Sequence, residues 1–178
     1  MSISGCGFRP LYGPVSSQSD EHITSQEFLA SIHIALITDR KGQMFRNELI
    51  SLITPLGQPK NALYTLRADL TETSQALGIL KDATFSVSQM TYRVNFELIE
   101  STTRQVVFKS SATVVTDYNV ITDNEYATIV SAQNSQKRSL TLLAQEVFRE
   151  LITFFQQKEQ EVEQESLKSG DIPNNRHN

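Results

Sequence analysis

Residues 91–100 read Thr-Tyr-Arg-Val-Asn-Phe-Glu-Leu-Ile-Glu, and apolar and polar side chains alternate through most of this stretch. The apolar positions are Tyr92, Val94, Phe96 and Leu98, and the polar ones between them are Arg93, Asn95 and Glu97. Successive side chains of a β-strand point to opposite faces, so the segment predicts a strand with one dry and one solvated face.

Three other segments carry the same period of two. Leu63–Thr71 sets Tyr64, Leu66, Ala68 and Leu70 against Thr65, Arg67 and Asp69. Gln105–Tyr118 sets Val106, Phe108, Ala112 and Val114 against Lys109, Ser111 and Thr113. Ser31–Ile37 is a shorter first strand, with Ile32, Ile34 and Leu36 on one side. The polar connection at 101–104 predicts a hairpin, and Ser74–Ser86, which carries Leu77, Ile79 and Leu80, is expected to be a loop.

Two segments change to helical spacing. The first runs from about Gly42 to Thr54, can be capped by Thr38 or Asp39, and ends at Pro55 and Gly57. The second is long and is capped by Thr122 or Asp123. Its apolar stripe is formed by Tyr126, Ile129, Val130, Leu140, Ala144, Val147, Leu151 and Phe155.

The predicted order is therefore β-α-β-β-β-α. Both amphipathic helices and the dry sheet face need cover, which favours a two-layer α+β sandwich. We expect a mostly antiparallel four-stranded sheet with two helices packed on one face. Residues 1–25 are expected to form an N-terminal lipidation site and flexible tether, 26–156 the folded domain, and 157–178 a disordered polar tail.

Composition excludes several classes of protein. The chain has 178 residues, a formal net charge of -4 and one cysteine. A single thiol excludes an internal disulfide framework and cysteine-rich zinc modules. The mild acidity argues against a general nucleic-acid binder. No apolar run approaches the roughly 20 residues that a membrane-spanning helix needs.

A search for catalytic chemistry finds little. His22, His33 and His177 have no partner at metal-ligand spacing. The sequence contains no Gly-x-Ser-x-Gly nucleophile elbow and no phosphate-binding glycine loop. We therefore expect a protein that is not an enzyme and that needs no cofactor and no metal.

The segment Ile3-Ser4-Gly5-Cys6 has the form of a lipobox, in which small residues precede a cysteine that becomes acylated. Cys6 is the only cysteine, lies near the start of the sequence, and precedes a Gly- and Pro-rich stretch. The basic and apolar part of a signal peptide is missing from this sequence. A chance free thiol is the alternative interpretation.

The polar face of the predicted sheet carries Arg67, Arg93 and Lys109. A solvated face is the ordinary interpretation of such a pattern. The sharper hypothesis is a docking surface for anionic groups, because Arg and Lys pair with phosphate. Lys81, in the expected loop before the third long strand, is a further candidate.

Several segments together resemble a known family. They are Gly5-Cys6-Gly7-Phe8-Arg9-Pro10-Leu11-Tyr12-Gly13, Asp39–Leu49, Asp117-Tyr118-Asn119-Val120, Glu125-Tyr126-Ala127 and Leu143-Ala144-Gln145-Glu146. In order and spacing they resemble the lipopolysaccharide-assembly lipoproteins of the LptE family, from about Cys6 to Phe155. The family fold agrees with the order of elements predicted above.

This resemblance implies a lipid-anchored protein on the periplasmic side of the outer membrane, with Cys6 as the attachment residue. Its implied partners are lipopolysaccharide and an LptD-like outer-membrane β-barrel, which it plugs and helps to assemble; nucleic acid is not among them. An auxiliary lipoprotein of an ABC-type phospholipid transporter remains the alternative function.

Overall fold

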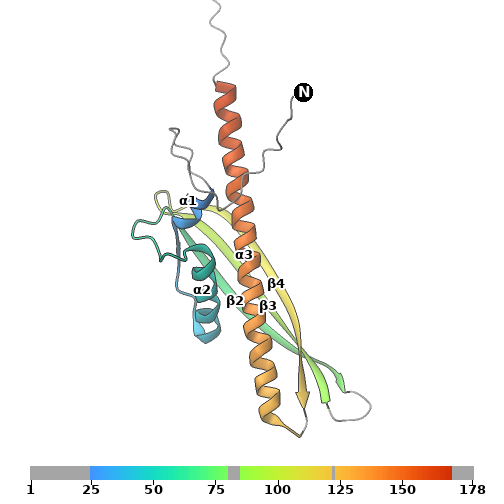
Figure 1. The fold of residues 1–178 in the computed structure, drawn as a ribbon. Helices are drawn as coiled ribbons and strands as arrows, with labels where there is room; N and C mark the ends of the chain where they lie inside the picture. The colour runs from blue at the N-terminus through green and yellow to red at the C-terminus, as the bar shows by residue number, and fades with distance from the viewer. Residues whose placement is uncertain (1–24, 80–84, 122, 170–178) are drawn as a thin grey trace, which may run out of the picture.

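A computed structural model describes residues 25–79, 85–121 and 123–169 (Figure 1). The elements in chain order are α1 (Ser25–Ala30), β1 (Ile32–Ile34), α2 (Asp39–Ile53), β2 (Tyr64–Ile79), β3 (Phe85–Glu100), β4 (Val106–Ile121) and α3 (Glu125–Ser169). The α+β class and the order β-α-β-β-β-α are confirmed, with the short helix α1 added before the first strand.

The four strands form one sheet in the order β1-β2-β3-β4. β1 pairs with β2 in parallel, and the other two pairs are antiparallel. The three long strands have 16 residues each. The loop expected at Ser74–Ser86 is wrong at both ends, because β2 continues to Ile79 and β3 begins at Phe85. A register shift between Ala76 and Gly78 accommodates this less regular sequence within the ladder.

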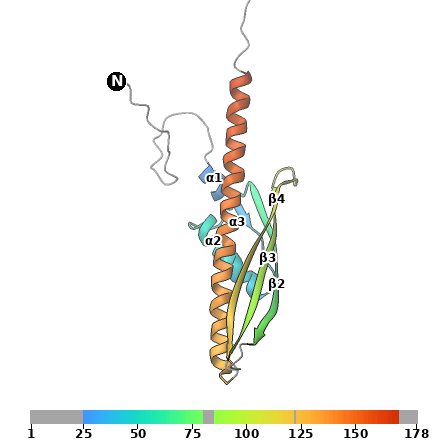
Figure 2. The ribbon, with the colours of Figure 1, turned by 90° about the vertical axis from the view of Figure 1, so that its right-hand side faces the viewer.

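Both α2 and α3 lie on the same side of the sheet, as Figure 2 shows edge-on. The predicted dry face is buried against them: Tyr92, Val94, Phe96 and Leu98 of β3 belong to the core, together with Phe45, Leu49 and Ile53 of α2. Val106 is an exception to the prediction. A bulge between the pairs Leu98↔Phe108 and Ile99↔Val106 turns the Val106 side chain to the outer face, where it is 50% exposed.

The start of α2 is fixed by short-range contacts with β1 and its connection. Asp39 has a φ of 66°, and its carboxylate accepts a hydrogen bond from the N–H of Gly42 at 2.8 Å, as a capping residue does. A Cβ at Gly42 would lie 2.7 Å from Cγ2 of Ile37, so only glycine allows this approach. Arg46 donates to the carbonyl oxygens of Ile34 and Ala35 at 3.1–3.2 Å, which ties α2 to the end of β1.

The N-terminal end of α3 differs from the prediction in two ways. The capping residue is Asn124, whose side-chain oxygen accepts from the N–H of Ala127 at 2.9 Å. Tyr126 and Ile129 do not enter the core, and Tyr126 is 78% exposed. The rest of the apolar stripe from Leu140 to Phe155 packs on the sheet as predicted.

The C-terminal end of α3 also differs. The helix continues to Ser169, so a disordered tail from residue 157 is wrong for 157–169; residues 170–178 lie outside the described part. Figure 1 shows this extension running beyond the sheet at the end where α1 lies. None of the helices that the structure describes combines the length and apolarity needed to cross a membrane.

A group of aromatic rings joins α1, β2 and α3 near this end. Phe155 is fully buried and stacks on Phe28 with ring centroids 5.1 Å apart. It also meets Tyr64 edge-on at 5.4 Å. Lys158, one helical turn further along α3, donates to the Tyr64 hydroxyl at 2.9 Å and lies over the Tyr64 ring. The helix α1 has only six residues and would not be stable alone, so this aromatic packing holds it in place.

Candidate functional site: the polar face of the sheet

The polar face of the sheet is organised in cross-strand rows. In one row, Arg67 of β2 pairs with Glu97 of β3, and Glu97 pairs with Lys109 of β4. The adjacent row contains Asp69, Asn95 and Ser111. Arg67 and Lys109, predicted from separate strands, are therefore brought to the same row with a carboxylate between them.

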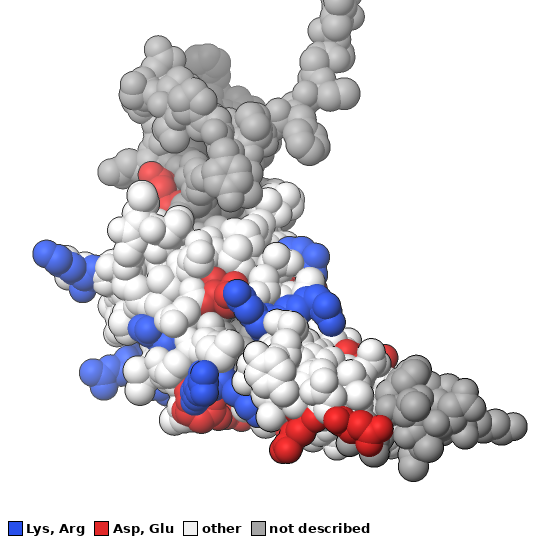
Figure 3. All heavy atoms as spheres, turned by 60° about the horizontal axis from the view of Figure 1, so that its bottom comes forward, with Lys and Arg blue, Asp and Glu red and all other residues white. Residues whose placement is uncertain are grey.

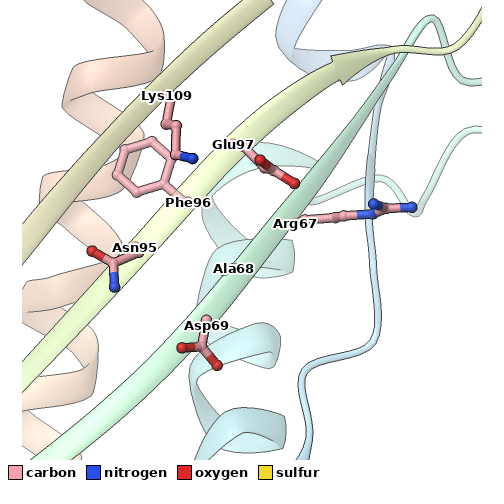
Figure 4. A pocket seen from close by; sticks show the side chains of 7 residues that line it. All are labelled: Arg67, Ala68, Asp69, Asn95, Phe96, Glu97 and Lys109. Carbon is pink, nitrogen blue, oxygen red and sulfur yellow. The ribbon is translucent and has the colours of Figure 1, made fainter. Parts of the chain in front are cut away.

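These two rows border a shallow hollow of about 250 Å³. Its lining residues are Arg67, Ala68, Asp69, Asn95, Phe96, Glu97 and Lys109. Figure 4 shows their side chains, with Glu97 between the strands that carry Arg67 and Lys109 and with Asp69 and Asn95 on the neighbouring row. The hollow offers carboxylate, amide, guanidinium and ammonium groups together, a set that can bind a polar ligand carrying both hydroxyl and anionic groups.

Arg93 is not part of the hollow. It lies earlier in β3 than Asn95 and Glu97, opposite Thr71 and Thr113, and is exposed. Cys6 and Lys81 lie outside the described residues. The structure thus groups two of the five predicted site residues and sets Arg93 apart from them.

Sequence inspection missed the acidic and amide members of the hollow. Glu97, Asp69 and Asn95 were assigned to the polar face but not to a site. The signal that finds them is the register of the hairpin, which places Glu97 directly opposite Lys109. On the described part of this face, Arg67, Arg93 and Lys109 are accompanied by Asp69, Glu97 and Asp117, so the charges balance. Figure 3, which views the molecule from the end opposite α1, shows both basic and acidic side chains on that side as well.

A second surface feature lies at the end of the molecule opposite α1. Exposed apolar side chains occur towards this end on three elements: Leu77 in the last part of β2, Ile121 at the end of β4, and Tyr126 and Ile129 in the first turns of α3. We call this group the apolar tip. Leu77, which the sequence predicts to lie in a loop, belongs to β2 and is 51% exposed. Tyr126 and Ile129 are three residues apart, so they share one side of the helix.

The strongly perturbed titratable group belongs to the interior rather than to the hollow. Burial raises the pKa of the Tyr92 hydroxyl far above its usual value, and the Glu72 carboxylate raises it further. Lys41 of α2 forms an ion pair with Glu72 of β2 at 2.6 Å. This arrangement keeps the phenol protonated and links α2 to the sheet.

No group of three or more His, Cys, Asp or Glu side chains suited to a metal ion occurs among the described residues. The comparison with known proteins decides between the binding functions considered above. The family model LptE, described as lipopolysaccharide-assembly, matches residues 29–154, which includes β1 to β4, α2 and most of α3.

The chain belongs to the LptE family. The resemblance inferred from the sequence is thereby confirmed. The LptE family is a non-enzymatic lipoprotein family, and membership makes this chain a lipopolysaccharide-assembly lipoprotein of the cell envelope.

Solved structures support the LptE-like fold. A putative lipoprotein from Caulobacter crescentus CB15 is 22% identical with a TM-score of 0.59, over 75% of this chain and 96% of that one. Rare lipoprotein B from Shewanella oneidensis is 11% identical with a TM-score of 0.56, over 72% and 98%. A minor lipoprotein from Acinetobacter baumannii is 19% identical with a TM-score of 0.52, over 68% and 91%. No curated protein shows a significant match.

Proposed function

We propose that this protein is an outer-membrane lipoprotein that plugs an LptD-like β-barrel, assists its assembly, and helps deliver lipopolysaccharide to the outer leaflet. The observation that carries the proposal is the LptE family match across residues 29–154, the folded part of the chain. Cys6 is the proposed lipid-attachment residue. Its acyl chains anchor the protein at about 0.8 kcal/mol per buried methylene, so several chains hold it firmly.

Two surfaces support this function by their chemistry. The apolar tip exposes Tyr126 and Ile129, which suits contact with another protein, since such patches mark interaction sites. The hollow on the polar face offers groups for the sugar hydroxyls and phosphates of lipopolysaccharide. We assign the barrel contact to the apolar tip and the lipopolysaccharide contact to the hollow.

Purification of the native protein from detergent-solubilised outer membranes tests the partner. We expect a β-barrel of the LptD type to co-elute with the full chain. Replacing Tyr126 by glutamate places a charge in the apolar tip and should reduce the recovery of the barrel several-fold. The matched control is Arg138→Glu, an exposed change on the solvent side of α3. Absence of the barrel from the wild-type eluate would count against the proposed function.

The hollow predicts a distinct effect on ligand binding. Arg67→Glu should weaken binding of purified lipopolysaccharide about tenfold, because one charge-assisted contact is lost and a repulsive charge replaces it. Thermal stability should hardly change, since Arg67 is exposed. Fluorescence titration at low and high salt measures both the loss and its expected screening.

Arg138→Glu is again the control, because it makes the same charge change on the opposite layer of the fold. Competition with phospholipid vesicles separates the proposed ligand from that of a phospholipid transporter. If Arg67→Glu binds lipopolysaccharide as tightly as the wild type, or if salt has no effect, the hollow is not the binding site.

A further inference from the structure

The edge of β4 that does not pair with β3 has two parts, which differ in their hydrogen bonds. At its C-terminal part, hydroxyl groups of α3 bond to the backbone groups that point away from β3. The bonds are Ser135 Oγ to the carbonyl oxygen of Asp117 at 3.2 Å, the N–H of Asn119 to Ser131 Oγ at 3.3 Å, and the N–H of Ile121 to Thr128 Oγ1 at 2.8 Å. In this strand, therefore, odd-numbered residues direct their backbone groups outward.

The register with β3 runs without interruption from Phe108 to Ile121, so the same alternation holds further along β4. The backbone groups of Lys109, Ser111, Thr113 and Val115 consequently point outward. Within the described parts of the chain, these outward N–H and C=O groups have no hydrogen-bond partner. An edge with unpaired backbone groups is a template for another strand.

The space beside this stretch is open. A groove of about 340 Å³ lies between β4 at Ser110 and α3 at Glu150 and Thr153, next to the rings of Phe108 and Phe154, which stack with centroids 4.7 Å apart. Figure 2 shows α3 close to β4 at the apolar tip and farther from β4 towards the start of the strand. Among the described residues, no helix or further strand is hydrogen-bonded to this edge at residues 109–115.

We propose that this edge pairs with the same edge of a second copy of the chain, antiparallel and with the two-fold axis at Ala112. Lys109 then lies opposite Val115 of the second copy, and Ser111 lies opposite Thr113. Each of these residues belongs to a pair that exchanges two backbone hydrogen bonds. The two four-stranded sheets join into one continuous sheet, an isologous arrangement in which one surface serves both subunits.

Three features of the edge favour a second copy as the occupant. Lys109 is the one charged residue of 109–115, and this register sets it opposite a valine rather than another lysine. Its aliphatic stem can cover Val115, which is 55% exposed in the single chain. The next outward pair would join residue 107, in the bulge, to Asp117, whose carbonyl Ser135 already occupies. The proposed pairing is therefore limited to residues 109–115, by the bulge on one side and by the Ser135 contact on the other.

Opposite charge changes at Val115 test this register. Val115→Lys sets a new lysine opposite Lys109 of the second copy twice per dimer, whereas Val115→Glu sets a glutamate there. We expect sedimentation equilibrium of the full 178-residue chain at low salt to show a concentration-dependent wild-type dimer. The dissociation constant should rise about tenfold with lysine and fall several-fold with glutamate. At high salt the dissociation constants of the two variants should become similar, because the charges are screened.

A second pair of variants tests the backbone bonds. Thr113→Pro removes an outward N–H without removing a bond to β3, and proline is tolerated at such edge positions. It should weaken the dimer about 10- to 30-fold, because its bond and the symmetry-related one are both lost. Thr113→Ala, the control, should leave the constant within about twofold. Circular dichroism checks that each variant folds. If the proline variant does not fold, the two Val115 variants alone test the proposed pairing.

A wild-type chain that remains monomeric at every concentration overturns the proposal, and so does a shift in the same direction for both Val115 variants. A strand supplied by a different protein would give the first of these results. The inference does not depend on the proposed function: dimerisation without barrel recovery, or the reverse, would separate the two.

Discussion

Replacing Phe155 by alanine should lower the free energy of unfolding by about 3–5 kcal/mol, the usual cost of deleting a buried aromatic ring. Phe155 is fully buried and contacts rings from two other elements, Phe28 of α1 and Tyr64 of β2. Loss of the ring opens a cavity where these elements meet α3. The change corresponds to a melting temperature roughly 10–20 °C lower for a domain of this size.

Phe155→Leu is the matched variant, because it keeps most of the volume and loses only the ring geometry. It should cost about 1–2 kcal/mol. Chemical denaturation followed by circular dichroism measures both changes. Equal stabilities of the alanine variant and the wild type would show that the rings around Phe155 contribute little to the fold.

Replacing Cys6 by alanine should abolish acylation and release the protein from the membrane. Under the proposed function the Cys6 sulfur receives the lipid, and the sequence contains no other cysteine. Expression in the native host, labelling with a palmitate analogue and fractionation of the envelope measure the loss. Ser16→Ala, a change at another small polar residue of the N-terminal segment, is the control and should leave labelling intact. Persistent labelling of the Cys6→Ala protein would assign the lipid to a different group.

The long strands were predictable wherever burial imposes a period of two. Tyr92, Val94, Phe96 and Leu98 alternate because one face of β3 is packed and the other solvated. The same alternation predicts which side chains share each face of the sheet, and it places Arg67 and Lys109 together on the polar face. Where packing relaxes, the signal disappears. Residues 74–79 of β2 show no such alternation, yet pairing with β3 holds them in the sheet as far as Ile79.

Other features depend on relations that a single segment does not contain. The outward turn of Val106 follows from a bulge, which only the pairing with Ile99 reveals. The hollow needs the register of three strands, since Glu97 becomes part of it only when set between Arg67 and Lys109. The helix α1 is fixed by Phe28 against Phe155, a contact between residues far apart in the chain.

The extension of α3 past Phe155 has a consequence for how this helix melts. A separate helix of that length would be marginal, because forming its first turn is costly. Here the packed turns before Phe155 supply the nucleus, and each further residue only extends an existing hydrogen-bond ladder. The extension should therefore unwind residue by residue from Ser169 inward, with amide-exchange protection that rises smoothly towards Lys158 rather than in one cooperative step. The length of the helix therefore decreases gradually as the temperature rises, while the sheet and the packed part of α3 stay folded.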